Sequence, residues 1–156
     1  MSGLDERFLA VLEALVVRLE GRSIDWALTG STAHVLQGVS VTPNDVDVQT
    51  TEEGAYAIEA VFAGEVVDPV SPTESTTIRS HFGAFELGEI RVEVMGDVQK
   101  RRADGTWEPP VDVTEHRTFV DVGGLSVPVL SLEYEVAAYE RMGRSGRAAL
   151  LADHVE

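Results

Sequence analysis

Residues 45–50, DVDVQT, alternate polar and apolar side chains with a period of two. This period is typical of a β-strand, because successive side chains of a strand point to opposite faces of the sheet. Val46 and Val48 share one face. The other face carries Asp45, Asp47 and Gln49. The chain must therefore fold around a strand that holds two carboxylates on one face, about 7 Å apart.

Two carboxylates on one strand face have two interpretations. Acidic side chains are mostly exposed, so the pair can be a solvated surface. Alternatively, the two charges repel each other and a divalent cation relieves the repulsion, as in sites where carboxylates hold Mg²⁺ and leave positions open for water and phosphate oxygens. We therefore treat Asp45 and Asp47 as candidate ligands of Mg²⁺ or Mn²⁺, and both interpretations stay open at this point.

A third carboxylate, Glu93, has the same kind of position. In the run IRVEV, Ile90, Val92 and Val94 alternate with Arg91 and Glu93. If this strand pairs beside the strand of Asp45, all three carboxylates converge, and such a site can hold two metal ions that serve a hydroxyl group and a triphosphate. Otherwise Glu93 is an exposed strand residue, and Glu89 or Asp97 becomes the candidate third carboxylate.

A Gly-Ser turn precedes the acidic strand. Residues 26–29, WALT, read as a short buried strand, and Gly30-Ser31 opens a helix-like segment. Glycine permits close approach of a phosphate, and a serine at this position offers a hydroxyl and an N-cap. Ordinary helix capping accounts for most Gly-Ser pairs, so the pair alone has little specificity. His34, one turn later, could contribute to a pocket, but a position on the helix surface is favoured.

The remaining chain mixes helix and strand patterns without a repeat or a long linker, so we expect one domain, residues 1–156. Helices are predicted over 4–20, 31–37, 52–62, 132–142 and 144–154, and strands over 26–29, 45–50, 76–79, 83–87, 89–95, 118–122 and 125–129. Ser2, Thr51 and Ser131 are predicted helix N-caps, and residues 97–117 are predicted to form a loop. The fold class is α+β, with a mixed β-sheet and helices packed mainly on one face.

Composition excludes several functions. The chain has no cysteine, and its four histidines show no ligand spacing, so disulfides, thiolate sites and zinc are not expected. The net charge of −15 argues against general nucleic-acid binding. Lysine is depleted beside eleven arginines and an acid excess, a composition typical of halophiles. The N-terminal segment does not resemble a signal peptide and no apolar run is long enough to span a membrane, so we expect a cytoplasmic protein.

Together, LTGSTAHVLQG, NDVDVQT and RVEVM resemble the nucleotidyltransferase superfamily typified by DNA polymerase β. More narrowly, Trp26 before the Gly-Ser motif and VPVLSLEYEVAAYERMGR near the end are similar to small adenylyltransferases that act on aminoglycosides and lincosamides. The resemblance covers most of residues 22–145. It implies the nucleotidyltransferase fold, with Asp45, Asp47 and Glu93 as catalytic residues and ligands of Mg²⁺ or Mn²⁺.

The resemblance also implies a nucleotide site and a reaction. Gly30, Ser31 and Arg144 would bind the nucleotide, ATP by preference, and AMP would pass to a hydroxyl of a small molecule or a protein. The chain departs from the family pattern at Thr29, where many relatives have glycine, and at Tyr139, where many have lysine. Arg141, Arg144 or Arg147 would replace that lysine as the triphosphate contact.

A second interpretation is a binding protein on the same fold. Small nucleotidyltransferase-like proteins resemble antitoxins that pair with a separate helical toxin, some modifying it and some only binding it. The short chain, which lacks a larger helical substrate domain, fits this alternative. A homodimer also stays open, and neither interpretation involves a membrane.

Overall fold

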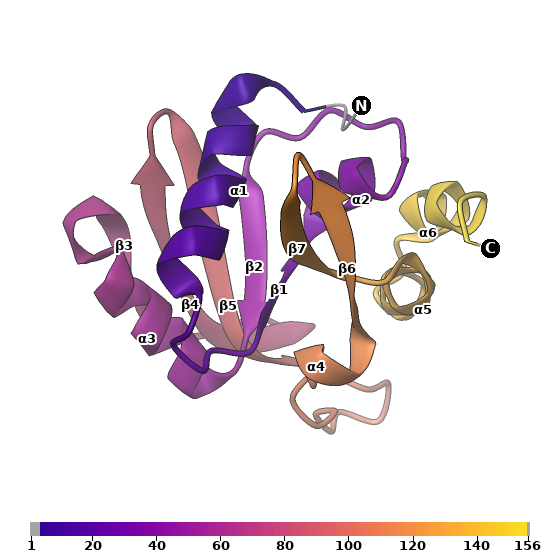
Figure 1. The fold of residues 1–156 in the computed structure, drawn as a ribbon. Helices are drawn as coiled ribbons and strands as arrows, with labels where there is room; N and C mark the ends of the chain where they lie inside the picture. Colours follow the sequence, from indigo (N-terminus) through magenta and orange to yellow (C-terminus); the bar gives the residue numbers. More distant parts are fainter. Residues whose placement is uncertain (1–3, 156) are drawn as a thin grey trace.

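A computed structural model describes residues 4–155 and shows a seven-stranded sheet flanked by helices (Figure 1). The helices are α1 (Glu6–Leu19), α2 (Gly30–Leu36), α3 (Glu52–Val61), the 3-10 helix η1 (Ala63–Glu65), α4 (Val113–His116), α5 (Leu132–Arg141) and α6 (Ser145–Ala152). The strands are β1 (Trp26–Thr29), β2 (Val46–Thr50), β3 (Val66–Glu74), β4 (Ile78–Leu87), β5 (Ile90–Lys100), β6 (Arg117–Val122) and β7 (Leu125–Leu130).

The sheet is mixed, and its strand order is β3-β4-β5-β2-β1-β7-β6. The central strand β2 is antiparallel to β1 and parallel to β5, while β1 is parallel to β7. The outer pairs β3–β4, β4–β5 and β6–β7 are antiparallel. The prediction of an α+β fold with a mixed sheet is confirmed, and strands β2 and β5, which carry the acidic residues, lie side by side.

The apolar face of the central strands forms the main core. Val46, Val48, Val92 and Val94 are buried there, and α1 and α3 supply the facing side chains. These include Phe8, Val11, Leu12, Leu15, Leu19, Ala55 and Ile58, and Phe62 directly after α3 joins them. The predicted cap Ser2 lies outside the described residues. In the structure Asp5 caps α1 and accepts hydrogen bonds from the backbone amides of Arg7 and Phe8.

Helices α4 and α5 pack against the opposite face. Ala27 alternates with Leu28 along β1, so the two side chains point to opposite faces. Leu28 joins the main core, whereas Ala27 packs with Val113 and Leu130 in a separate cluster to which Tyr134 of α5 also contributes. Helix α6 then packs on α5. The predicted caps Thr51 and Ser131 are confirmed, because their hydroxyls accept backbone amides of the first helical turns.

The β-rich second half differs from the prediction. Strand β3 was not expected, and its Pro69 and Pro72 are tolerated because β3 is an edge strand that pairs only with β4. Residues 78–87 form one strand where two were predicted, and β5 continues to Lys100 through an irregularity near Asp97, whose φ is 51°. The predicted loop 97–117 therefore begins later, and it contains the short helix α4.

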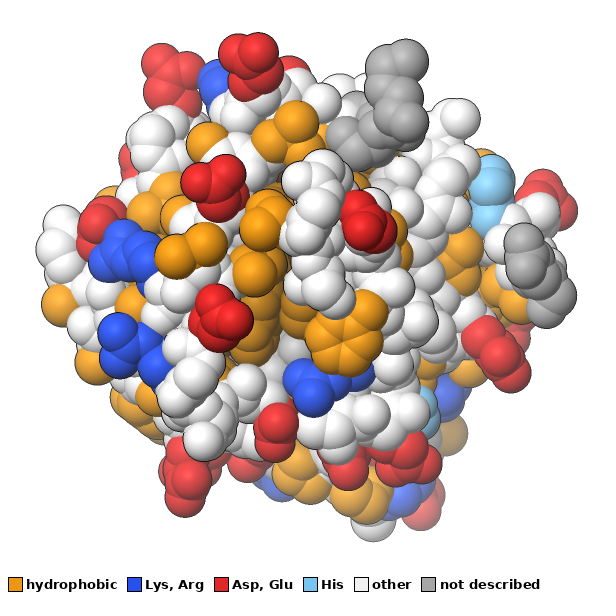
Figure 2. Space-filling view, in the orientation of Figure 1, with side chains coloured by type: hydrophobic (Ala, Val, Ile, Leu, Met, Phe, Trp, Pro, Cys, Tyr) orange, Lys and Arg blue, Asp and Glu red, His pale blue; other side chains and the backbone are white. Residues whose placement is uncertain are grey.

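One face of the molecule is hollowed between α1 and the β6–β7 hairpin, and hydrophobic side chains gather there (Figure 2). Leu9, Leu36, Val120 and Leu125 line this groove, with Glu13 and Asp121 as acidic neighbours. Within residues 4–155, no helix combines the length and apolarity needed to cross a bilayer.

Candidate active site

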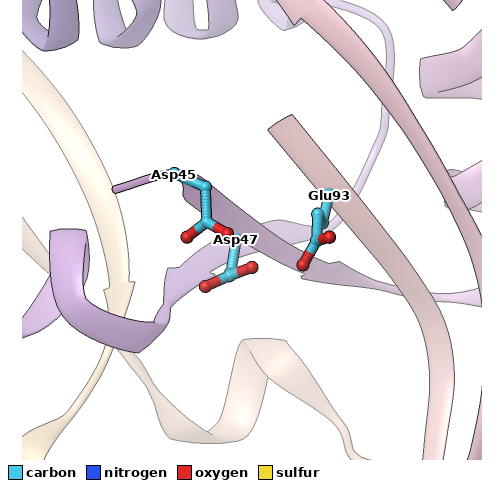
Figure 3. A group of neighbouring side chains, drawn as sticks. All are labelled: Asp45, Asp47 and Glu93. Carbon is cyan, nitrogen blue, oxygen red and sulfur yellow. The ribbon is translucent and has the colours of Figure 1, made fainter. Parts of the chain in front are cut away.

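The three predicted carboxylates meet on the polar face of the sheet. Asp47 of β2 lies opposite Glu93 of β5 in the parallel register, and Asp45 directly precedes β2. Carboxylate oxygens of the three residues lie within 4.8 Å of one another. In Figure 3 the side chain of Glu93 points from its own strand toward Asp47, and Asp45 lies beside Asp47. The sequence prediction that these groups converge is thus met by the geometry.

The alternative third carboxylates lie elsewhere. Glu89 sits in the β4–β5 turn, where its carboxylate faces Arg7 at 3.4 Å. Asp97 accepts a hydrogen bond from the backbone amide of Glu52, at the start of α3. Neither residue joins the group of converging carboxylates among the described residues.

The electrostatics of the cluster favour a bound proton or cation. Burial raises the pKa of Asp47 to about 8, with further contributions from the charges of Asp45 and Glu93. Burial also raises the pKa of Asp45, with the charge of Glu93 adding to the rise and Arg91 opposing it. Arg91 is bound to Glu93, whose Oε2 accepts from its Nε at 2.9 Å. One arginine does not balance three carboxylates, so the cluster keeps excess negative charge.

Gly30 makes room for Asp47. Its φ is 73°, in the left-handed region that favours glycine, and a Cβ atom at this position would lie 2.3 Å from Oδ2 of Asp47. A larger residue would therefore displace the carboxylate. The hydroxyl of Thr32 donates to the backbone carbonyl of Asp45 at 2.7 Å and ties α2 to the start of β2. The Gly-Ser turn is thus built against the acidic cluster.

Ser31 lies in the first turn of α2 and is not its N-cap, which corrects the sequence prediction. The N-cap is Thr29, and its side chain makes no capping hydrogen bond. Instead, the Thr29 hydroxyl donates to Oε1 of Glu135 on α5. The hydroxyl of Ser31 consequently remains available to a neighbour, and Nη1 of Arg147 lies 3.5 Å from it.

Two residues near the site, His34 and Glu135, were misplaced or missed by the sequence analysis. The favoured surface position of His34 is wrong, because its side chain is fully buried. Its ring contacts Arg147 and lies near Glu135. Glu135 was not singled out, although it is only 3% exposed. No local signal in the sequence indicated these positions, because the burial of Thr32, Ala33 and His34 is known only from the structure.

Arg144, the predicted nucleotide contact, is exposed. Its guanidinium lies over the ring of Tyr139, with 4.6 Å between Cζ and the ring centroid. Arg141 pairs with Glu108 instead, with 3.4 Å between its Nε and a carboxylate oxygen of that residue. Of the three arginines proposed to replace the missing lysine, the structure brings Arg147 to Ser31.

The residues of the cluster fit a divalent cation. Carboxylate oxygens are the donors that Mg²⁺ and Mn²⁺ prefer, and two ligands on opposite sides of one Mg²⁺ lie about 4.2 Å apart. Oxygens of Asp45, Asp47 and Glu93 lie within 4.8 Å of one another, so modest side-chain rotation would bring them to a shared cation. A cation would also offset the repulsion from Asp45 and Glu93, which adds to the effect of burial in raising the pKa of Asp47.

Comparison with known proteins agrees with this geometry. The model of the aminoglycoside-2''-adenylyltransferase family matches residues 11–156. TM1012 of Thermotoga maritima, provisionally assigned as a nucleotidyltransferase, is 45% identical, with a TM-score of 0.85 over 94% of this chain and 91% of that one. No curated protein matches the sequence.

Two antibiotic-modifying enzymes share the fold at low identity. The lincosamide adenylyltransferase LnuA, solved with lincomycin, is 8% identical and has a TM-score of 0.58. The match covers 99% of this chain and 100% of LnuA. ANT(2'')-Ia in solution is 14% identical, with a TM-score of 0.63 over 96% of this chain and 85% of that one.

Proposed function

The chain belongs to the aminoglycoside-2''-adenylyltransferase family, and we propose that it transfers AMP from ATP to a hydroxyl group. The observation that carries this proposal is the convergence of Asp45, Asp47 and Glu93 beside the Gly30–Ser31 turn. Nucleotidyl transfer requires negative charge on the protein where a cation and a polyphosphate meet, and this is the arrangement of the cluster.

In the proposed reaction, an acceptor oxygen attacks the α-phosphorus of ATP in line with the bridge to the β-phosphate. The new oxygen–phosphorus bond forms as the bond to that bridging oxygen breaks, and pyrophosphate leaves. The acceptor proton passes to Glu93, which lies on the strand next to Asp47. Positioning and neutralisation of charge account for most of the rate enhancement in such transfers.

Mg²⁺ or Mn²⁺, when bound, supplies the positive charge that phosphate oxygens and an ionising hydroxyl require. Asp45, Asp47 and Glu93 would hold it. Ser31 and the backbone of Gly30 face the phosphates, together with an arginine near the start of α6, for which the sequence suggested Arg144. We place the reaction in the cytoplasm, where ATP is available.

The acceptor class is proposed by analogy with the structural neighbours. LnuA was solved with lincomycin and ANT(2'')-Ia with adenylyl-2''-tobramycin, both of them polyhydroxylated antibiotics. We propose a hydroxyl-rich small molecule of this kind as acceptor for the present chain. A hydroxyl of a partner protein is the alternative acceptor.

Transfer of radiolabel tests the proposal. The protein is incubated with α-³²P-ATP, Mg²⁺ or Mn²⁺, and a panel that contains tobramycin, lincomycin and candidate partner proteins. Labelled product with release of pyrophosphate is expected, and Asp45→Asn/Asp47→Asn should give none. Metal-dependent ATP binding without label in any acceptor would contradict catalysis and favour the non-catalytic interaction protein.

A further inference from the structure

Arg147 connects the last helix to the Gly-Ser turn. Its Nη1 lies 3.0 Å from Nδ1 of His34 and 3.5 Å from the hydroxyl of Ser31. The residue sits on α6, which is held in place by packing of Ala148 and Leu151 against Leu132 and Tyr139 of α5. A cation from the C-terminal helix is thereby fixed at the side of the candidate active site, more than a hundred residues from the turn in sequence.

The contact with Arg147 determines which ring nitrogen of His34 carries the proton. A guanidinium only donates hydrogen bonds, so Nδ1 of His34 must accept, and the ring is neutral with its proton on Nε2. That N–H faces Oε1 of Glu135 at 3.5 Å, longer than a normal hydrogen bond. Glu135 therefore acts on the ring mainly as a nearby negative charge, and its firm bond is the one it accepts from Thr29.

The ring of His34 has little freedom to move. The side chain is fully buried, its edge packs against Tyr139 with 5.7 Å between ring centroids, and Glu135 behind it is 3% exposed. Because packed side chains occupy single rotamers, Nδ1 presents a fixed acceptor to Arg147. The series Thr29–Glu135–His34–Arg147 thus runs from the end of β1 to the hydroxyl of Ser31.

The charge of Arg147 is not balanced by a partner. Among residues 4–155, no carboxylate forms an ion pair with its guanidinium. His34 and Ser31 are neutral, and they engage one of its terminal nitrogens. A half-buried cation with unused donors favours an anion beside it. Such an anion would lie next to Ser31, whose neighbour Gly30 faces Asp47.

We propose that Arg147 binds the β- and γ-phosphates of the nucleotide, and that His34 and Glu135 are positioning residues for its guanidinium. This inference rests on the proposed function and deepens it, since it assigns the group that recognises the polyphosphate. It also moves the assignment from Arg144, which is exposed and stacked on Tyr139, to the arginine that reaches Ser31.

Matched arginine variants test the assignment. Affinities for ATP and for AMP are measured by titration in Mn²⁺ for wild type, Arg147→Ala and Arg144→Ala. Loss of a charge-assisted contact should weaken ATP binding by about 10–100-fold in Arg147→Ala, while AMP binding changes little because AMP lacks the β- and γ-phosphates. Arg144→Ala should change the ATP-to-AMP affinity ratio by less than about threefold. Arg147→Lys should lie between wild type and Arg147→Ala.

The positioning role has its own variants. His34→Leu removes the acceptor and should lower the ATP-to-AMP affinity ratio, with no further loss when it is combined with Arg147→Ala. His34→Asn, whose side-chain oxygen can replace Nδ1, should restore much of the ratio and serves if His34→Leu does not fold. Glu135→Gln keeps an acceptor for Thr29 and should give a smaller fall. A purely structural role would change melting temperature without changing the ratio.

The possible failures are distinguishable. If Asp45→Asn/Asp47→Asn loses metal-dependent ATP binding but Arg147→Ala keeps the wild-type ratio, the assignment of Arg147 is wrong and the proposed function stands. A larger effect of Arg144→Ala than of Arg147→Ala would restore Arg144 as the contact. If wild type binds no ATP with metal, or the double aspartate variant binds it equally well, the proposed function and this inference both fail.

Discussion

The two faces of β2 and β5 are built from alternate residues of the same strands but behave in opposite ways. On one face, Val46, Val48, Val92 and Val94 are buried against α1 and α3 and contribute to the stability of the fold. On the other, Asp45, Asp47 and Glu93 crowd negative charge together, which burial and mutual repulsion make costly. Removing a side chain from the first face should destabilise the protein, whereas removing a charge from the second should impair ligand binding and turnover.

This contrast shows how a small fold accommodates a strained site. Because successive side chains of a strand point to opposite faces, neighbouring residues can serve the apolar core and the acidic site separately. The apolar face continues across several strands into one large cluster, so the cost of the acidic face is spread over many favourable contacts. Charge repulsion stored in the ligand-free protein becomes affinity for a cation, because a ligand that binds the native state relieves it.

The largest expected effect is on turnover. Glu93→Gln preserves size but removes the charge that would accept the acceptor proton, and loss of a general base typically lowers rate by about 10²–10⁴-fold. Nucleotide affinity should change much less. Transfer rate and ATP affinity are measured together, with the exposed Glu89→Gln as control. If Glu93→Gln turns over at the wild-type rate, Glu93 has no catalytic role and is only a surface residue of its strand.

The apolar face should respond in stability alone. Leu12 is fully buried on α1, and Leu→Ala at such positions costs about 2–5 kcal/mol of unfolding free energy. Val17 on the same helix is 57% exposed, and Val17→Ala should stay within about 0.5 kcal/mol of wild type. Denaturant unfolding measures both. The stabilisation by metal and ATP should be equal in the two variants; a selective loss in Leu12→Ala would show that the faces are coupled.

Substitutions at two glycines, Gly30 and Gly38, distinguish the effect of backbone strain from the effect of crowding at the acidic site. Gly30 and Gly38 both have positive φ, so alanine at either costs about 1–2 kcal/mol in strain. At Gly38 nothing lies within 4 Å of the added Cβ, whereas at Gly30 it would meet the carboxylate of Asp47. Gly30→Ala should therefore weaken metal-dependent ATP binding, and Gly38→Ala should not. Equal affinities in the two variants would show that Asp47 moves aside without consequence.

The last expected effect concerns the pH dependence of stability. The pKa of Asp47 is raised to about 8 from an ordinary value of 3.8, so the folded, ligand-free protein binds a proton that the unfolded chain has released. The resulting stability is complete below pH 3.8 and is lost as pH rises through about 8. The slope from this one group is at most about 1.4 kcal/mol per pH unit. Unfolding of wild type and Asp47→Asn from pH 5 to 9 measures the difference.

In that comparison, Asp47→Asn should gain relative stability as pH rises. A difference between the two proteins that stays constant with pH would show that Asp47 is ionised throughout. Saturating Mg²⁺ should flatten the wild-type dependence, because metal binding requires the ionised carboxylate.

Local patterns predicted the acidic face well. The period-2 runs DVDVQT and IRVEV indicate which side chains share a face, and the only further requirement is that β2 and β5 are neighbours. Thr51 and Ser131 were likewise predicted as caps, because capping depends on residues within one turn. These features involve short distances along the chain or simple alternation, so the sequence shows them directly.

Features that depend on tertiary packing were not predictable in this way. His34 and Arg147 are separated by 113 positions, and only the packing of α6 on α5 brings them together. Strand β3 contains two prolines, which argue against a strand unless it lies at an edge, and edge position is a property of the whole sheet. The missed elements are those whose environment is set by distant segments.

The most direct test of the central claim is the stabilisation that metal and ATP together confer on wild type and on Asp45→Asn/Asp47→Asn. For wild type we expect about 2.7 kcal/mol at one hundred times the Kd, measured as a shift in thermal or denaturant unfolding relative to the same protein without ligand. Using each protein as its own reference removes any gain that the double variant has from relieved repulsion. The account predicts that the double variant shows no shift; equal shifts in both proteins would contradict it, because nucleotide would then bind away from the acidic cluster.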